Sequence, residues 1–420
     1  MCRRVNSMPE LLSPAGNPEK LRAAIRFGAD AVYLSGKSFG MRAAAGNFTL
    51  DEMREGVAYA HERGVRAYIT LNTSPRTDEY SALEAYLEEL SDISPDALIV
   101  GDIGVLSLVR RRAPSIPIHI STQANVVSAE TACAFASLGA ERIVLSRELS
   151  LDEIQKIRLS LPSEVELEAF VHGAMCISYS GRCLLSNYLA GRDAGHGACT
   201  QPCRWHYSAR CVEAELIEEK RPGEAIPVYE EAGETFFMSS RDLCMIAHIP
   251  ALFRAGISSF KIEGRMKSAY YTAVVTNAYR MAIDAYLSGS DAYDTLWGAE
   301  VYSVSHRDYD TGYYFDSPHT HAKVTERDGY LREKAYLARV ISYDPVNKTA
   351  LFEQKNKLCE GEPVEILTPG RSGIPFVASG LSDEEGGSLS SAPHPGMRFR
   401  LPVPIPVAEG DLLRGGERQE

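Results

Sequence analysis

The sequence predicts an α/β fold, namely a (β/α)8-type barrel with a cysteine-bearing insertion, followed by a small C-terminal β-barrel domain. Eight short apolar runs alternate with helical segments, the pattern of parallel strands joined by crossover helices. A doubly wound open sheet gives a similar local pattern, but eight is the number of strands that closes a barrel. We expect the barrel at residues 8–300, the insertion at about 172–257 and the small domain at 320–420.

The strands and helices of the barrel are expected from independent signals. The expected strands are Glu10–Ser13, Ala31–Ser35, Arg66–Leu71, Ala97–Val100, Ile116–Ser121, Arg142–Ser146, Val165–Val171 and Ser258–Ile262. Asn17 is placed to cap the helix that follows it, and the pairs Thr49 with Glu52 and Ser150 with Glu153 are spaced as capping boxes. The helix starts therefore support the strand positions without depending on them.

The chain after the last barrel strand changes character. A long helical stretch covers Lys267–Leu287, and from about residue 320 short alternating runs are separated by Gly, Pro and Asp. The expected strands of this part include Lys334–Ser342, Thr349–Glu353, Pro363–Thr368 and Met397–Leu401. This pattern predicts the small β-barrel domain.

Composition limits the classes of function. The 420 residues are 45% hydrophobic and 24% charged, as in ordinary soluble proteins, and no apolar run approaches the roughly 18 residues of a membrane span. No apolar segment of a signal peptide follows the N-terminus, so we expect a cytoplasmic protein without a membrane partner. The formal net charge of -12 excludes a basic coat, so any nucleic acid must contact a local basic patch.

Polar residues follow most of the expected strands, where active sites of such barrels lie. These residues are Ser13, Ser35, Thr70, Asn72, Asp102, Ser121, Gln123, Ser146, Arg147, His172, Glu263 and Arg265. Each one alone could be a turn or cap residue. Together they predict a polar mouth at the carboxyl ends of the strands.

Four of the nine cysteines form a constellation in the expected insertion. Cys176, Cys183, Cys199 and Cys203 are separated by six, fifteen and three residues. Four thiolates suit a tetrahedral zinc ion or a 4Fe-4S cluster, and buried cysteines acting as small apolar residues are a third interpretation. Structural zinc sites usually pair ligands as C-x2-C, which is absent here, so the spacing favours the cluster.

The segment His172–Trp205 resembles the motif of peptidase family U32. The resemblance extends over residues 8–290 and includes Glu10–Asn17, Gly28–Tyr33 and Ser259–Arg265. It implies an iron-sulfur protein of RNA or quinone hydroxylation. Within the family the chain is most similar to the prephenate-dependent tRNA uridine 5-hydroxylases, which modify the wobble uridine without molecular oxygen. The implied cofactor is a 4Fe-4S cluster, prephenate is the implied co-substrate and tRNA the implied partner.

The resemblance also assigns the ligands of the cluster. It places the cluster on Cys176, Cys183, Cys199 and Cys203. One member of the quinone branch takes its fourth cysteine from further along the chain, where Cys244 lies here, so Cys244 is the reserve ligand. The segment Ser303–Arg307 departs from the aromatic-rich, Asn/Arg-containing stretch of many relatives.

Catalytic candidates lie at the ends of the last two barrel strands. His172 could shuttle a proton or donate to the cluster, although a histidine that only bonds a backbone carbonyl is equally consistent with this position. The alternating residues are Lys261, Glu263, Arg265 and Lys267, so their side chains share one face of an extended segment. They could clamp prephenate or a phosphate, or form a salt-bridged strand end.

Basic and aromatic residues interleave among the cysteines. The candidates for RNA binding are Arg182, Arg192, Arg204, Trp205 and Arg210. Arginines hold phosphates and aromatic rings stack splayed-out bases, although the same residues could pack the insertion onto the barrel rim.

Two other functions fit parts of the sequence. A peptidase or collagenase-like hydrolase would suit the family name, but the chain contains no H-E-x-x-H and no G-x-S-x-G. A cluster-bearing subunit that forms a hetero-oligomer with a second family member, acting on tRNA or a quinone, is also compatible with these residues.

Overall fold

The computed structural model describes residues 8–42, 46–205, 240–290, 292–316 and 330–416, with the backbone of four short strands between 215 and 236. These strands are β8 (Glu215–Ile217), β9 (Ala225–Pro227), β10 (Tyr229–Glu231) and β11 (Glu234–Phe236).

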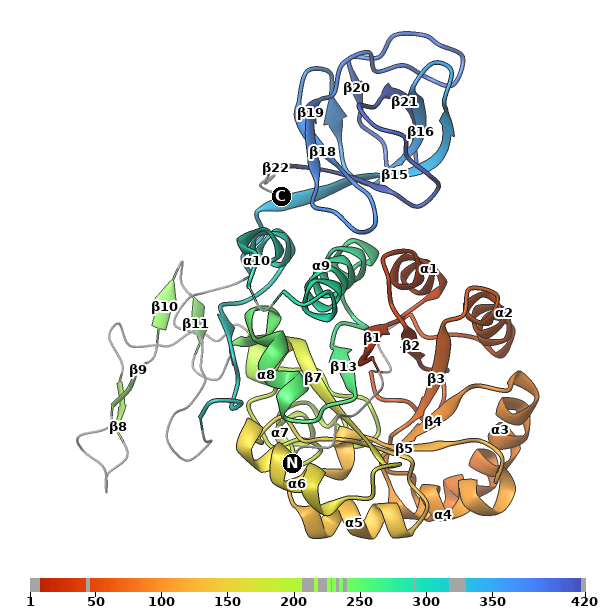
Figure 1. Cartoon of the computed structure of the whole chain (residues 1–420), viewed down its shortest axis with the longest axis vertical. Coiled ribbons are helices and arrows are strands. Elements are labelled where there is room, and N and C mark those ends of the chain that lie inside the picture. Colours follow the sequence, from red (N-terminus) through yellow and green to blue (C-terminus); the bar gives the residue numbers. More distant parts are fainter. Residues whose placement is uncertain are drawn as a thin grey trace.

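Eight parallel strands close into a barrel, as predicted (Figure 1). They are β1 (Glu10–Pro14), β2 (Ala31–Leu34), β3 (Arg66–Leu71), β4 (Ala97–Val100), β5 (Ile118–Ile120), β6 (Arg142–Val144), β7 (Glu166–Ala174) and β13 (Ser259–Ile262). Strand β13 pairs with both β1 and β7, which closes the sheet and makes the open-sheet alternative wrong.

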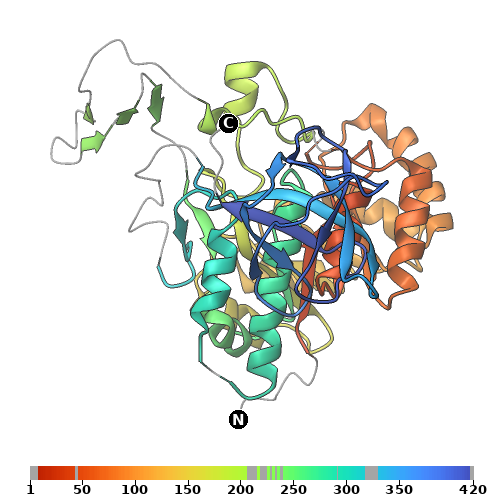
Figure 2. The ribbon, with the colours of Figure 1, turned by 90° about the horizontal axis from the view of Figure 1, so that it is seen from above.

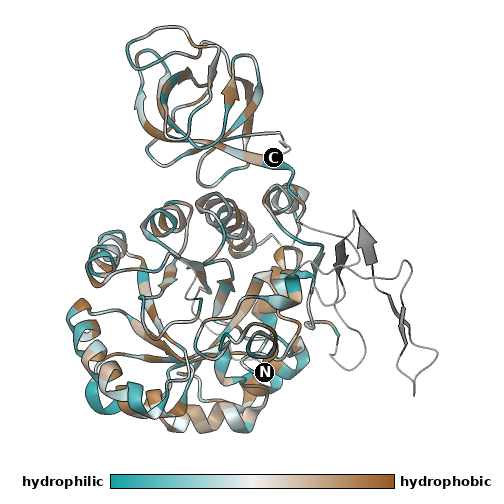
Figure 3. Cartoon of the chain, turned by 180° about the vertical axis from the view of Figure 1, so that it is seen from behind, coloured by the Kyte–Doolittle hydropathy of each residue, from teal (hydrophilic) through white to brown (hydrophobic). Residues whose placement is uncertain are grey.

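Helices surround this barrel. They are α1 (Pro18–Arg26), α2 (Leu50–His61), α3 (Tyr80–Ile93), α4 (Ile103–Arg112), α5 (Ala129–Ser137), α6 (Leu151–Ser160), α8 (Ile249–Arg254), α9 (Ala269–Leu287) and α10 (Thr295–Tyr302). Both expected capping boxes are formed, at Thr49 with Glu52 and at Ser150 with Glu153. Hydrophilic residues colour the outward turns of the rim helices in Figure 3. In the described part of the chain, no helix has the length and apolar character needed to cross a membrane.

The chain between β7 and β13 carries the cysteines. It contains α7 (Leu185–Ala190) and the short 3-10 helix η3 (Pro202–Arg204), and it returns to the barrel as β12 (Asp242–Cys244). Strand β12 pairs antiparallel with the end of β7, and β14 (Tyr309–Asp310) pairs parallel with β12. The last part of the expected insertion is thus framework that extends the barrel wall.

The C-terminal domain is an antiparallel half-barrel sheet in the order β19-β18-β22-β15-β16-β21. Its strands are β15 (Lys334–Asp344), β16 (Thr349–Gln354), β18 (Pro363–Leu367), β19 (Ile374–Val377), β21 (Arg398–Pro402) and β22 (Leu412–Gly416), with β17 (Leu358–Cys359) paired to β20 (Ser391–Ala392). Figure 2 shows this domain lying across the barrel helices. Arg414 fixes it there, because its buried guanidinium lies 2.6 Å from the carboxylate of Glu300 on α10.

The interior of the barrel contains a network of buried charge. Arg142 on β6 donates to Glu10 at 2.6 Å and to Glu168 at 3.1 Å. It also meets Glu166 at 2.5 Å. The ammonium of Lys261 lies 2.6 Å from the other oxygen of Glu168, so the network reaches β13. Every one of these ions has an opposite charge in contact, which a buried ion needs.

Candidate functional site

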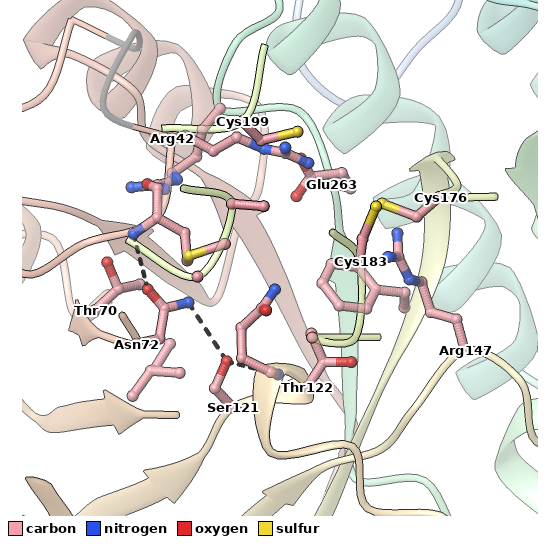
Figure 4. A pocket seen from close by; sticks show the side chains of 18 of the residues that line it. Arg42, Thr70, Asn72, Ser121, Thr122, Arg147, Cys176, Cys183, Cys199 and Glu263 are labelled. Atoms are coloured by element: carbon pink, nitrogen blue, oxygen red, sulfur yellow. Dashed lines mark hydrogen bonds and ion pairs between the residues drawn. The ribbon is translucent and has the colours of Figure 1, made fainter. Parts of the chain in front are cut away.

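A pocket of about 130 Å³ opens at the carboxyl ends of the barrel strands. Its walls contain many of the polar residues expected at the mouth: Thr70, Asn72, Ser121, Gln123, Arg147, Glu263 and Arg265. Cysteines Cys176, Cys183 and Cys199 line the same pocket (Figure 4). The fold therefore joins the cysteine segment to the strand ends.

Two glycines allow this close approach. Gly181 has φ +72°, and a Cβ there would lie 2.3 Å from the backbone oxygen of Gln123 in the loop after β5. Gly197 has φ +78°, and its Cβ would lie 2.8 Å from the oxygen of Gly40. Glycine adopts such positive φ values without strain and leaves room for the neighbouring backbone. The cysteine loops can thus rest directly on the barrel loops.

Cys203 lies near the other three thiols, although it does not line the pocket wall. Burial raises the pKa of Cys203, and the nearby thiols of Cys176, Cys199 and Cys183 raise it further. Cys199 Sγ accepts a hydrogen bond from the amide of Gln201, at 3.4 Å. Amide donation of this kind is typical around sulfur ligands of metals.

Cys244 lies in a different environment. It sits on β12 opposite His172 of β7. Burial raises its pKa to about 11, with Ile246 and Tyr279 as its hydrogen-bonding neighbours. Cys244 does not line the pocket, and no other cysteine is among the groups that shift its pKa, so its position separates it from the other four thiols.

Arginines surround Cys176. Desolvation in the pocket acts to raise the pKa of this thiol, but the guanidinium groups of Arg147 and Arg42 hold it below its usual value. Arg147 also donates to the carbonyl of Ala174 at 2.9 Å, while its Nε is buried and has no hydrogen-bond partner among the described residues. The pocket therefore favours a thiolate at Cys176 and retains unused donor capacity.

The three candidates on and after β13 all line the pocket. Glu263 accepts from Tyr33 at 3.2 Å and lies 3.5 Å from Arg42. Burial acts to raise the pKa of Glu263, but Arg42 and Arg265 lower it below its usual value. Arg265 donates to the carbonyl of Met41, and its buried Nη1 has no partner in the described structure. Lys261 donates to Glu168 at 2.6 Å, whereas Lys267 does not line the pocket and donates to the carbonyl of Ser305 at 3.0 Å.

A polar floor lies below the thiols and arginines. Asn72 accepts from the amide of Met41 at 3.0 Å and donates to Ser121 at 3.4 Å, as the dashed lines in Figure 4 show. The hydroxyl of Thr70 is buried and unpartnered among the described residues. Amide and hydroxyl groups of this kind can both donate and accept hydrogen bonds.

His172 lies outside the pocket. It is a completely buried residue within β7, where its two ring nitrogens lie 3.4 Å from the hydroxyl of Tyr279 and 3.2 Å from that of Tyr309. Burial lowers its pKa to about 3. The divergent segment 303–307 adjoins this aromatic group: His306 stacks on Tyr309 with ring centroids 4.2 Å apart.

The RNA-binding candidates differ in their exposure to solvent. Arg182 and Arg192 are exposed on the cysteine segment, and Trp205 is 38% exposed. Arg204 instead holds the segment together, since it donates to the carbonyl of Met175 at 3.1 Å. Arg210 lies outside the described residues.

Sequence reasoning missed Arg42 and Tyr33. Arg42 belongs to the loop after β2, and its φ of +70° is uncommon for a residue with a side chain. The stretch between β2 and α2 is long for a βα loop, and long loops on the catalytic face of a barrel often carry function. The length of this loop was the signal in the sequence that could have indicated a functional residue there.

No group of three His, Cys, Asp or Glu side chains stands close enough to hold a single metal ion in the ranges that the structure describes. Figure 4 shows three of the thiols at the pocket, with Cys176 and Cys183 beside Arg147 and Cys199 beside Arg42.

Comparisons with known proteins agree with this architecture. Residues 16–323 match the model of peptidase family U32, and residues 332–414 match that of the peptidase family U32 C-terminal domain. The chain is 34% identical over 424 residues to tRNA hydroxylation protein P1 of Bacillus subtilis, covering 99% of this chain and 96% of that one. It is 36% identical over 430 residues to tRNA hydroxylation protein P of Escherichia coli, covering 94% of each.

A relative with a different name shows the same extent of similarity. The chain is 30% identical over 424 residues to a collagenase of Porphyromonas gingivalis, covering 98% of each chain. The matches span both domains and include the cysteine segment and the strand ends. The chain therefore belongs to peptidase family U32.

Proposed function

We propose that this protein hydroxylates RNA, and that its substrate is C5 of the wobble uridine of tRNA, modified without molecular oxygen and with prephenate as co-substrate. The observation that carries this proposal is the composition of the mouth pocket. Three cysteines line it together with four basic side chains (Arg42, Arg147, Lys261 and Arg265) and a single carboxylate, Glu263. The names of the Bacillus and Escherichia relatives support hydroxylation of tRNA.

Cys176, Cys183, Cys199 and Cys203 would hold a 4Fe-4S cluster in this pocket. The residues fit such a group because three of the thiols line one pocket with the fourth nearby, a cubane binds one thiolate per iron, and the nearby arginines lower the pKa of Cys176. A cubane also accepts ligands that are more widely spaced than those of a single metal ion. When bound, the cluster would supply one-electron chemistry at the pocket mouth.

The floor of the pocket would receive the base. A pyrimidine presents donors and acceptors on one edge, and Asn72, Thr70 and Ser121 offer hydrogen-bonding groups at that depth. Bases of single-stranded loops are unstacked, so a loop nucleotide can enter such a pocket at a low energetic cost. The exposed Arg182 and Arg192 would hold phosphates on the outside.

The arginines would bind the carboxylates of prephenate. Arg265 Nη1 and Arg147 Nε are both buried without a partner in the described residues, although a buried donor normally has one. A dicarboxylate would satisfy both groups and offset the excess of positive charge. Glu263, held ionised by Arg42, is placed to orient Tyr33 and Arg42 beside the bound molecules.

Peptidase activity is the weaker interpretation of this pocket. A serine or cysteine peptidase needs a nucleophile hydrogen-bonded to a base, usually histidine. Among the described lining residues there is no histidine. Ser180 bonds Glu148 at 3.3 Å, which leaves it without such a base.

The proposal is tested with anaerobically purified protein and with cells that lack the gene. We expect a visible absorption band, about four irons per chain, and unmodified wobble uridine in the tRNA of deleted cells, detected by mass spectrometry. Wild-type protein should restore the modification and Cys176→Ala should not. Zinc in place of iron, or an unaltered wobble uridine after deletion, would overturn it.

A further inference from the structure

A second cavity, of about 460 Å³, lies between the barrel and the C-terminal domain. Helix α1 and the end of α2 form one wall, and β15 and β22 form the other. We propose that this interdomain groove binds the phosphate backbone of the RNA, at a distance from the nucleotide that enters the mouth pocket. This inference rests on the proposed function.

Four arginines line the groove: Arg22, Arg26, Arg63 and Arg339. They extend along α1, past α2 and onto β15, so they do not converge on one point. A single phosphate needs converging donors, whereas a distributed row suits successive phosphates of a chain. The lining also contains the carboxylates of Glu19 and Glu409, which leaves an excess of two positive charges in a protein of net charge -12.

Two of the arginines have their charge largely available. The guanidinium groups of Arg22 and Arg63 lie 4.5 Å and 3.6 Å from the ring centre of Tyr59. Within the described residues no carboxylate forms an ion pair with Arg22, and Arg63 meets only Glu62, whose side chain is 71% exposed. An exposed pair of this kind is weak, so both arginines can turn to a phosphate.

The other two arginines build the wall. Arg26 pairs with Asp411 at 2.5 Å and Arg339 with Glu353 at 3.0 Å, which fixes the two domains and the strand pair. Yet Arg339 Nε and the hydroxyl of Tyr336 are buried and unpartnered in the described structure. Both residues line the groove, where a phosphate or ribose oxygen could accept from them.

Helix α1 connects the groove to the mouth pocket. Lys20 at its start donates to the carbonyl of Arg265, a residue of that pocket, at 2.9 Å. Arg22 and Arg26 follow on the same helix, which has nine residues and a length of about 14 Å. An RNA with one base in the mouth can therefore continue along α1 into the groove. In this arrangement the C-terminal domain gives the barrel a second contact with the stem beside the loop.

The test compares two RNAs with two proteins. The RNAs are the unmodified anticodon arm with its stem, and a single-stranded oligonucleotide with the loop sequence alone. The proteins are the wild type and the double variant Arg22→Gln/Arg63→Gln, which changes two solvent-accessible side chains. The matched control is Arg111→Gln, an exposed arginine on α4 elsewhere on the barrel. A thermal unfolding curve checks that each variant is folded.

We expect the double variant to bind the arm roughly tenfold more weakly per arginine at about 0.1 M salt, with the slope of log K against log salt reduced by about 0.9 per lost phosphate contact. Binding of the loop oligonucleotide should be unchanged, and the control should match the wild type. Equal binding of the arm by wild type and double variant overturns the groove alone. Absence of saturable RNA binding by the wild type overturns both this inference and the proposed function.

Pyrophosphate serves as the probe for a small phosphate ligand. Saturable pyrophosphate binding that the double variant loses, combined with unchanged affinity for the arm, would assign the groove to a free phosphate compound and overturn the RNA assignment. Pyrophosphate also raises the ionic strength, which by itself weakens binding of the arm. If pyrophosphate weakens that binding no more than this effect predicts, the result supports the assignment of the groove to the RNA backbone.

Discussion

The barrel holds two groups of buried charged side chains, one in its interior and one at its mouth. They differ in whether every buried charged group has a partner. In the interior, Arg142 contacts three glutamates and Lys261 contacts one of them. At the mouth, Arg147 and Arg265 retain buried donors without partners among the described residues. A completed network holds a fold together, whereas an incomplete one in a pocket marks the place of a ligand.

The largest expected effect concerns the proposed iron-sulfur cluster at the mouth. Cys176→Ala should reduce bound iron from about four per chain to nearly none, because a cubane loses one of its four thiolates. Cys203→Ser should do the same, whereas Cys244→Ser should keep the iron, since Cys244 lies on β12 and does not line the pocket. Iron analysis and the visible spectrum measure this, with Cys133→Ala as the control. A full cluster in Cys203→Ser and none in Cys244→Ser would transfer the ligand role to Cys244.

The next effect compares how much an arginine of the barrel interior and an arginine of the mouth contribute to the stability of the fold. Arg142→Met should lower the free energy of unfolding by about 3–5 kcal/mol, because it removes the cation that Glu10 and Glu168 share and leaves these buried carboxylates with Arg66 and Lys261 alone. Arg147→Met should lower it by only about 1 kcal/mol, since it removes a hydrogen bond to a carbonyl and strands no buried carboxylate. Denaturant titration of both variants decides this. Equal losses would show that the mouth arginine is also part of the framework.

A smaller effect concerns the ligand that completes the mouth. Arg265→Gln should weaken binding of prephenate by about 10- to 100-fold, the worth of one charge-assisted hydrogen bond of roughly 1.5–3 kcal/mol. Calorimetric titration measures the affinity, and Arg111→Gln serves as an exposed arginine control. Unchanged affinity would place the dicarboxylate elsewhere.

The smallest effect tests whether His172 is held neutral in the buried framework of the barrel. Its folded-state pKa of about 3 lies below the unfolded value of about 6.5, so the unfolded chain takes up a proton first as the pH falls. The protein should therefore lose about 1.3 kcal/mol of stability between pH 7 and pH 5.5 through this residue. His172→Gln should lack that part of the pH dependence in denaturant titrations at the two pH values. An identical pH dependence in both proteins would mean that folding does not lower the pKa of His172.

Much of the architecture followed from local signals in the sequence. All eight barrel strands lie where the apolar runs predicted them, with ends that differ by up to three residues. Buried strands of a parallel sheet are rich in Val, Ile and Leu, and these residues remain visible here although the strands also carry Glu10, Arg142, Glu168 and Lys261. The capping boxes fixed the helix starts for a similarly local reason, since they satisfy amides within one turn.

The sequence by itself determined the family, the barrel and the cysteine segment, because each is written in spacing along the chain. Only the tertiary structure decided which charged side chains have an ion-pair partner. Lys261 and Arg265 looked alike in the sequence, yet Glu168 on the neighbouring strand β7 neutralises Lys261, whereas Arg265 keeps a buried donor without a partner among the described residues. The tertiary structure also places His172 outside the pocket, beside Tyr309, and places Arg42 from the loop after β2 in the pocket wall. Pairing between residues far apart in the chain depends on which strands are neighbours, and no local pattern records that.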